Sequence, residues 1–233
     1  MAEAQGAQRR GEALASVNGA ALLFDRSGAA WWPEERMLVV ADLHFEKGSS
    51  FARRGVLLPP YDTRETLARL EAACAVYEPR TVVALGDSFH DLDAAGRLAP
   101  DEIDRIRALT GRHEWYWIEG NHDPEPPRDL GGRCVAALAC GPLTFRHLPR
   151  HGARPGEVAG HLHPAARVTV RGRGLRRRCF VTDGSRLILP SFGAYTGGLD
   201  VLDKAFAGLL APSFHAWMIG QDRVYPVASR KLG

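Results

Sequence analysis

The stretch MLVVADLH (residues 37–44) joins a short apolar run to Asp42 and His44, two residues whose side chains can bind a metal ion. Apolar runs of this length that end at turn residues are typical of buried β-strands. The same arrangement appears in TVVALGD (81–87), EWYWIEGNHD (114–123), LTFRH (143–147) and EVAGH (157–161). We therefore expect a series of buried strands, each followed by a polar loop.

Two helices are expected between the first three of these strands. Asp62 and Glu65 have the spacing of a capping box, and apolar residues at helical spacing follow them until Pro79. A second helical pattern begins after Pro100 and stops at Gly111. The order strand, helix, strand, helix, strand indicates an α/β fold.

Further strands are expected on both sides of this region. The upstream sequence contains a predicted hairpin, SVNGAALLF (16–24) and AAWW (29–32). The downstream sequence contains ARVTVRG (166–172), RRRCFVTDG (176–184), SRLILPSF (185–192) and SFHAWMIGQDRVYPV (213–227). We expect two packed sheets flanked by helices, in a single domain over residues 1–233 with a flexible tail at residues 1–12.

The composition and the cysteines narrow the class of protein. The chain has 233 residues, of which 45% are hydrophobic and 24% charged, as in an ordinary soluble globular domain. Cys74, Cys134, Cys140 and Cys179 show no C-x-x-C spacing, which argues against structural zinc bound by thiolates. No apolar run approaches the roughly 20 residues that span a bilayer, and the N-terminus lacks a signal sequence. We expect a cytoplasmic protein with no membrane partner.

The positive charge is concentrated in one part of the chain. The formal net charge is only +3, yet residues 146–186 contain ten arginines and two acidic residues. A local excess of this kind can attract a polyanion, whereas the alternative is an arginine-rich hairpin that simply faces water.

Residues with metal-binding side chains stand at the carboxyl ends of the predicted strands: Asp42, His44, Asp87, Asn121, His147, His161 and His163. Loops at this edge of an α/β sheet converge, so we expect these side chains to meet in one cleft. Carboxylates and imidazoles together bind Mn-, Fe- or Zn-class ions, and seven ligands are too many for one tetrahedral ion. They suffice for two ions that act on a phosphate ester.

A glycine precedes three of these candidate ligands, at Gly86, Gly120 and Gly160. Glycine allows a sharp turn after a strand and a close approach of the backbone to other groups. We expect these glycines to bring the loops close to the metal site.

The ordered motifs D-x-H, GD, GNHD, a strand-end histidine and GHLH resemble the calcineurin-like metallophosphoesterase superfamily over about residues 37–164. This resemblance implies a four-layer αββα sandwich with two mixed sheets flanked by helices. ADLHFEKG (41–48), LPPYDTRETL (58–67), GDSFHD (86–91), GHLHPAARV (160–168) and FVTDGSRLILPSFGAYTGGLDV (180–201) are similar to the ligase-associated DNA-damage-response metallophosphoesterases, bacterial relatives of the SbcD-type nucleases. That group implies a phosphodiesterase or DNA endonuclease acting in repair beside a DNA ligase, a helicase and an exonuclease.

The resemblance also implies roles for individual residues. One ion would be bound by Asp42, His44 and His163, the other by Asn121, His147 and His161, with Asp87 bridging them. A hydroxide bridging two Mn ions, or two Fe or Zn ions, would attack phosphorus in line. His122 would face the scissile phosphate and protonate the leaving oxygen, with Asp123 orienting the site.

Two positions leave alternatives open. Many family members have GD-x-x-D, but here His90 occupies the last position and Asp91 follows it, so either could orient His122, and His90 could instead contact substrate. The fourth-motif ligand could be His151, although we prefer His147 because it ends an apolar run.

DNA backbone binding is expected from the arginines that follow GHLH: Arg167, Arg171, Arg173, Arg176, Arg177 and Arg178. Arg53, Arg54 and Arg64 could extend this surface, and Trp31, Trp32 and Tyr195 could stack on bases or belong to the core. The alternatives are a small-molecule phosphatase or cyclic-nucleotide phosphodiesterase, and a non-catalytic interaction module on the same fold.

Overall fold

The computed structural model describes residues 11–123 and 128–233, so residues 1–10 of the expected tail lie outside the described part. The first sheet consists of seven strands in chain order. The pairs from β1 to β4 are antiparallel, and the pairs from β4 to β7 are parallel. Its members are β1 (Ala13–Val17), β2 (Ala20–Phe24), β3 (Ala30–Trp32), β4 (Met37–Val40), β5 (Thr81–Ala84), β6 (Glu114–Ile118) and β7 (Arg133–Val135). All residues of β4 and β5 are buried, as expected of central parallel strands covered on both faces.

The second sheet has the order β15-β14-β12-β13-β10-β9-β8. Its members are β8 (Leu138–Cys140), β9 (Leu143–Arg146), β10 (Glu157–Ala159), β12 (Arg173–Thr182), β13 (Leu187–Ile188), β14 (His215–Ile219) and β15 (Val224–Ala228). The inner strand β10 is parallel to both neighbours, whereas the other pairs are antiparallel. A further strand, β11 (Ala165–Val170), pairs only with β12 and forms a hairpin with it.

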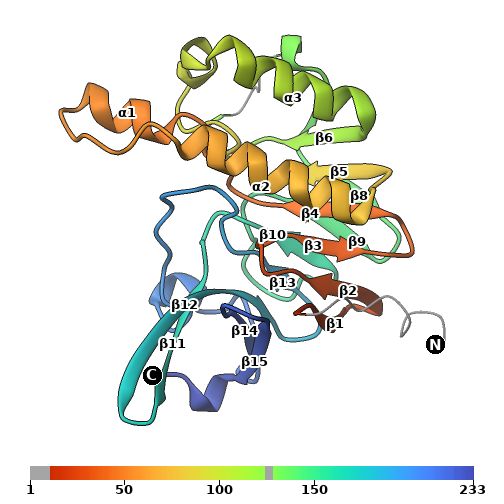
Figure 1. The fold of residues 1–233 in the computed structure, drawn as a ribbon. Helices are drawn as coiled ribbons and strands as arrows, with labels where there is room; N and C mark the ends of the chain where they lie inside the picture. The colour runs from red at the N-terminus through yellow and green to blue at the C-terminus, as the bar shows by residue number, and fades with distance from the viewer. Residues whose placement is uncertain (1–10, 124–127) are drawn as a thin grey trace.

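The helices complete the layers. The α-helices α1 (Lys47–Arg53), α2 (Asp62–Tyr77) and α3 (Pro100–Arg112) lie on the side of the first sheet away from the second sheet (Figure 1). The short 3₁₀ helices are η2 (Ala94–Arg97), η3 (Arg128–Leu130), η4 (Lys204–Phe206) and η5 (Ser229–Lys231). Phe206 in η4 packs with Val201 and Leu209 against the second sheet, so this outer layer is thinner than the helical one. The expected α/β fold with two mixed sheets and helices is confirmed.

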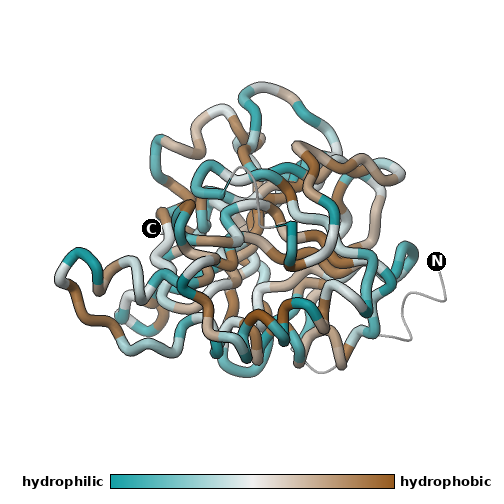
Figure 2. Tube along the Cα trace, turned by 90° about the horizontal axis from the view of Figure 1, so that it is seen from above, coloured by the Kyte–Doolittle hydropathy of each residue, from teal (hydrophilic) through white to brown (hydrophobic). Residues whose placement is uncertain are grey.

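Two apolar clusters hold the first sheet in place. Between the sheets, Phe24 stacks on Phe180 with ring centroids 4.4 Å apart, and Trp32 is buried beside them. On the other face, Leu67 of α2 and Ile106 of α3 pack against the sheet. Seen from above, apolar stretches gather in the interior and hydrophilic stretches occupy many of the turns (Figure 2). No helix among the described residues is long and apolar enough to cross a lipid bilayer.

The start of α2 differs from the expectation. Asp62 lies within the helix and its carboxylate accepts the N–H of Gly48 at 2.9 Å, while Glu65 pairs with Arg69 at 2.8 Å. The predicted capping box is therefore wrong, because a contact with α1 occupies the aspartate. At α3 the expectation holds, since Pro100 is the first residue and Glu102 accepts the N–H of Ala99 at 2.9 Å.

Candidate metal centre

Loops from both sheets meet at the carboxyl ends of β4, β5, β6, β9 and β10, and they carry the seven predicted ligands. Five of these residues have a left-handed backbone: Asp42 (φ 53°), His44 (47°), Asp87 (45°), His161 (68°) and His163 (45°). This conformation is unfavourable for residues with a side chain, by about 1–3 kcal/mol each, and tends to cluster at functional sites. The surrounding structure holds these residues in strained conformations that bring their side chains together.

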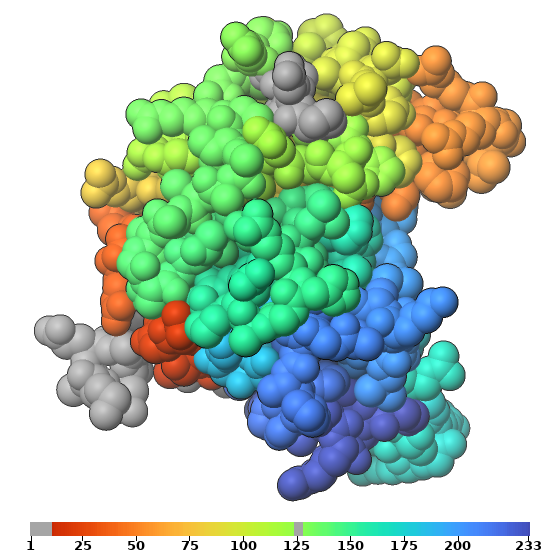
Figure 3. Space-filling view, turned by 180° about the vertical axis from the view of Figure 1, so that it is seen from behind, coloured from red at the N-terminus to blue at the C-terminus, as the bar shows by residue number. Residues whose placement is uncertain are grey.

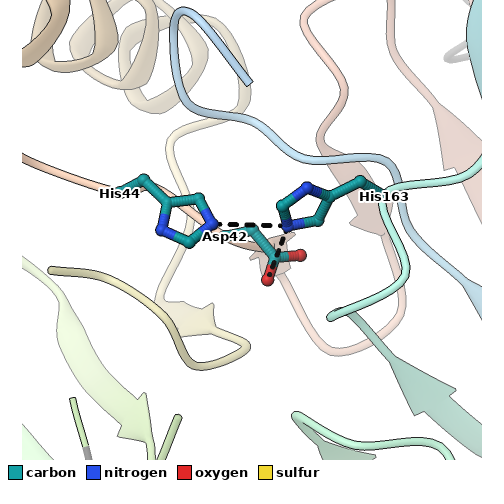
Figure 4. A group of neighbouring side chains, drawn as sticks. All are labelled: Asp42, His44 and His163. Atoms are coloured by element: carbon teal, nitrogen blue, oxygen red, sulfur yellow. Dashed lines mark hydrogen bonds and ion pairs between the residues drawn. The ribbon is translucent and has the colours of Figure 1, made fainter. Parts of the chain in front are cut away.

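The first group of converging side chains is Asp42, His44 and His163, whose candidate ligand atoms all lie within 4.8 Å of one another. His44 Nε2 is 3.3 Å from His163 Nε2, and this second nitrogen is 3.3 Å from Asp42 Oδ1 (Figure 4). Asp42 is anchored from another loop, because its carboxylate accepts the N–H of His161 at 3.0 Å.

The second group is Asp87, His147 and His161, also within 4.8 Å of one another. His147 Nδ1 lies 2.9 Å from the carbonyl of Leu85, so a proton on Nδ1 is donated there and Nε2 faces the site. That Nε2 atom is 2.8 Å from Asn121 Oδ1, 3.2 Å from His161 Nδ1 and 3.4 Å from Asp87 Oδ1. Asn121 therefore joins this group, as the sequence predicts.

The two groups share one buried site. His147 Nδ1 of the second group is 3.8 Å from Asp42 Oδ1 of the first. Both carboxylates are buried, and within 4.0 Å of them the described residues offer no cationic side chain except histidine. Buried carboxylates require compensating positive charge, so this arrangement favours a bound cation.

The protonation states point the same way. Burial opposes the charge of Asp87, but the hydrogen bond and the charge of His147 hold the pKa of Asp87 well below its usual range. Burial lowers the pKa of His44 to about 3, so this imidazole is neutral, which is the form that binds metal. His147 shows the opposite balance, since the carboxylates outweigh burial and raise its pKa to about 9. The carboxylates of the site thus keep a proton on His147, where a bound metal ion would otherwise supply the positive charge.

The chemistry of the donor set fits two divalent ions. It comprises two carboxylates, four imidazoles and one amide oxygen, and both three-residue groups lack a thiolate. Ligands of this kind suit Mn-, Fe- or Zn-class ions. The buried His44 Nδ1 has no hydrogen-bond partner among the described residues. A second unpaired nitrogen at the site belongs to His90.

His122 lies beside the two groups without belonging to either. Its backbone N–H donates to Asp87 Oδ1 at 2.9 Å, and its Nε2 is 3.8 Å from Asp87 Oδ2. The side chain is 43% exposed, so it can reach a molecule that enters the site. This placement is compatible with contact to substrate.

The structure distinguishes His90 from Asp91. The ring of His90 stacks on His122, with centroids 5.5 Å apart at 15°, and burial, together with the charges of Lys47 and His122, lowers its pKa to about 4. Asp91 instead binds Arg97 through two contacts of 2.8 and 2.9 Å. Burial opposes the charge of Asp91, but the Arg97 hydrogen bonds lower its pKa to about 2. His90 is thus the neighbour of His122.

Asp123 connects two loops of the site. Its Oδ2 accepts the N–H groups of Ser88 at 2.8 Å and Phe89 at 3.0 Å, which fixes the loop carrying Asp87 against the loop carrying His122. Burial raises the pKa of this carboxyl to about 7. Asp123 therefore holds the two loops of the site together.

The three glycines lie where a side chain would collide with the site. A Cβ on Gly86, whose φ is +68°, would lie 2.5 Å from His147 Cγ, and one on Gly160 would lie 2.8 Å from Asp42 Oδ2. A Cβ on Gly120 would overlap the backbone nitrogen of Asp87 and the carboxylate of Asp123. The expected close approach of these loops is confirmed.

The alternatives at the fourth motif are also separated in space. His147 is buried within the second group, whereas His151 is exposed and outside both groups. Contacts near the site that the sequence analysis missed come from Lys47, Phe51 and Arg97. Phe51 lies against His90 with centroids 5.9 Å apart, and Arg97 donates to Ser49 Oγ at 2.8 Å. Of these three residues, only Lys47 lies beside a metal-binding motif in the sequence, three residues after His44, so only Lys47 could have been predicted to lie near the site.

The six predicted DNA-contacting arginines do not form one surface. In the register of the β11–β12 hairpin, Arg167 lies directly opposite Arg176, and their side chains share one face. Arg177 lies opposite Ala166, so its side chain is on the other face. Arg171 and Arg173 lie at the exposed tip. The hairpin and α1 project from the same side of the molecule (Figure 1).

Arg178 is occupied by the protein itself. It donates to the carbonyls of Ser191 and Ser27, each at 2.9 Å, and burial lowers its pKa to about 10. The other residues considered for nucleic-acid contact divide similarly. Trp31 and Trp32 are core residues, whereas Tyr195 is 40% exposed. Arg53 and Arg64 form surface ion pairs with Asp93 and Asp101.

The chain is similar to one protein family and to solved structures. The calcineurin-like phosphoesterase family matches residues 35–185. The crystal structure of Pseudomonas putida nuclease MPE matches with 32% sequence identity and a TM-score of 0.70, covering 93% of this chain and 100% of that one. An Escherichia coli phosphoesterase, Yfce, matches at 13% identity with a TM-score of 0.41, covering 82% of this chain and 97% of that one. No curated protein matches at a significant level.

The family match, the two mixed sheets and the two His/Asp groups lead to one assignment. The chain belongs to the calcineurin-like phosphoesterase family and is a metal-dependent phosphoesterase.

Proposed function

We propose that the protein is a dinuclear-metal phosphodiesterase that cleaves DNA as an endonuclease in bacterial DNA repair. The observation that carries this proposal is the placement of two His/Asp groups in one buried site with the exposed His122 beside them. The nucleic-acid substrate is supported by the similarity to a bacterial nuclease. Within the family, the sequence motifs resemble those of the ligase-associated DNA-damage-response group, which supports a role in repair.

Two divalent ions, Mn in preference to Fe or Zn, would be held by the seven ligands of the site, with Asp87 shared between them. When bound, such ions neutralise phosphate charge and lower the pKa of a water molecule toward neutrality. Asp42 and Asp87 supply the negative charge that attracts the ions, and the neutral ring of His44 offers a lone pair.

His122 is the proposed acid that protonates the leaving oxygen. It is exposed toward the site entrance, lies outside both ligand groups and is held by its own backbone bond to Asp87. His90 fixes the plane of its ring by stacking, and Asp123 fixes the loop from which it projects. This arrangement suits an imidazole that delivers a proton to the leaving oxygen.

Arg167 and Arg176 on one face of the β11–β12 hairpin, with Arg171 and Arg173 at its tip, are proposed to contact the DNA backbone without reading sequence. Arg177 lies on the opposite face and is left out of this contact. Arg178 is left out because its guanidinium already binds two backbone carbonyls. We further propose that the chain works as a single domain in the cytoplasm, in functional association with a DNA ligase, a helicase and an exonuclease.

Hydrolysis assays with three substrates test this proposal. The substrates are bis(p-nitrophenyl) phosphate, p-nitrophenyl phosphate and supercoiled plasmid, each assayed with Mn and with chelator, and with His122→Ala as control. We expect Mn-dependent cleavage of the diester and nicking of the plasmid, both lost in His122→Ala. Activity on the monoester alone would indicate a small-molecule phosphatase. A purified protein that binds no transition metal and cleaves none of the three would indicate an interaction module.

A further inference from the structure

A groove of about 420 Å³ opens next to the second ligand group. One wall is the loop after β9 with Leu148 and His151, and the other is the segment around η4 with Lys204 and Leu209. His161 lines the groove and also belongs to the second ligand group, so the groove is continuous with the metal site. From behind, the surfaces of the chain near residue 150 (teal) and residue 205 (blue) adjoin (Figure 3).

A buried arginine fixes both walls of this groove. Arg186 is only 2% exposed, and its guanidinium donates to the carbonyls of Arg150 at 2.7 Å and Gly152 at 2.9 Å in one wall. It also donates to the carbonyl of Leu209 in the other wall. The buried Glu157 balances its charge, with an Oε2 to Nε distance of 3.0 Å. The groove is thus a built feature whose walls are connected through the protein interior.

The lining of the groove combines apolar and cationic groups. Leu162 and Leu209 are almost buried, and Leu148 is 50% exposed. Lys204 and His151 are exposed. The one carboxylate in the lining, that of Asp203, accepts the N–H of Ala205 at 2.8 Å. An apolar slot with a lysine at its rim suits a flat base that carries a phosphate, and pockets of this size accommodate such ligands.

We propose that this groove binds the nucleotide next to the scissile phosphate, with its base against the leucines and its neighbouring phosphate on Lys204. This inference rests on the proposed nuclease function and makes it more specific. It predicts that the protein recognises a polynucleotide beyond the scissile bond on the His161 side. A small diester has a single phosphate, so it cannot contact Lys204 through a second phosphate while its phosphorus lies at the metal site.

The test measures binding of a fluorescent single-stranded oligonucleotide by anisotropy, in a His122→Ala background that prevents cleavage. Lys204→Ala and Leu148→Asp are the groove variants, and both sites are exposed, so folding is preserved. Arg112→Ala at the end of α3 and Leu14→Asp on β1 are matched exposed controls. We expect the groove variants to weaken binding about 10- to 100-fold, the range for loss of a charged hydrogen bond or of a leucine contact, and the controls to bind like the parent protein.

Kinetics with the wild-type His122 restored give the second readout. The kcat/KM for an oligonucleotide should fall much further in the groove variants than the kcat/KM for bis(p-nitrophenyl) phosphate. If both groove variants bind and cleave oligonucleotide like the controls, the groove serves another occupant, such as a protein partner. That result would overturn the groove inference and leave the proposed nuclease function standing. If the parent protein neither binds nor cleaves oligonucleotide, the nuclease function itself is overturned.

Discussion

Replacing Gly86 by alanine should damage the metal site through a single methyl group. Gly86 precedes Asp87 and has a φ of +68°, and the new Cβ would lie 2.5 Å from His147 Cγ. The imidazole cannot retreat easily, because it is buried and Nδ1 is held at 2.9 Å from the carbonyl of Leu85. We expect the ring or the loop to shift, which moves the Nε2 atom away from Asn121 and His161.

Two terms set the size of the effect on the free energy of unfolding. A left-handed conformation costs an L-residue about 1–2 kcal/mol, and overpacking a filled site costs about 1–3 kcal/mol more. Gly86→Ala should therefore destabilise the protein by about 2–5 kcal/mol. Gly19, in the turn between β1 and β2, has a φ of +87° and nothing within 4 Å of its Cβ position. Gly19→Ala should therefore cost only the conformational term.

The assay is urea unfolding of both variants, together with Mn titration. The difference between the two variants isolates the collision with His147, and only Gly86→Ala should lose metal affinity. Equal destabilisation of both variants, with metal binding unchanged, would show that His147 has room to move and would refute this reasoning.

Further predictions concern single residues of the site and its support. Asp87→Ala should abolish hydrolysis and weaken metal binding, whereas His122→Ala should lower kcat by about 10²–10⁴-fold and retain metal. Elemental analysis measures the metal content of both variants. Equal metal loss in both would remove the distinction between a metal ligand and a general acid. Chelation should lower the Tm of the wild type, because Asp42 and Asp87 then lack compensating charge, and this shift should shrink in Asp87→Ala; an unchanged wild-type Tm would speak against a stabilising metal. Arg186→Met should destabilise the fold by about 3–5 kcal/mol, since it weakens the pairing of a buried carboxylate, and urea unfolding measures the loss.

Much of the fold and the candidate ligand set could be predicted from local sequence. The apolar runs of β4, β5 and β6 end at polar residues, and the parallel order of these strands brings Asp42, Asp87 and Asn121 to one edge. Pro100 and Glu102 mark the start of α3 because capping depends on neighbours in the chain. The sequence does not predict α1, β7 and β8, since α1 has only two turns and the two strands are short and not fully buried, without a continuous buried apolar run.

Other features depended on contacts between distant parts of the chain. Asp62 has the spacing of a capping residue, but its carboxylate is taken by Gly48. His90 and Asp91 are adjacent in the chain, yet only His90 stacks on His122, which comes from another loop. Arg178 differs from its exposed arginine neighbours because it is partly buried and its guanidinium meets the carbonyls of Ser191 and Ser27. Local sequence determined which residues end each strand, because side-chain pattern and backbone preference act over a few positions. Only the tertiary structure decided which of these side chains are free for chemistry, because hydrogen-bond partners and burial come from residues far away in the chain.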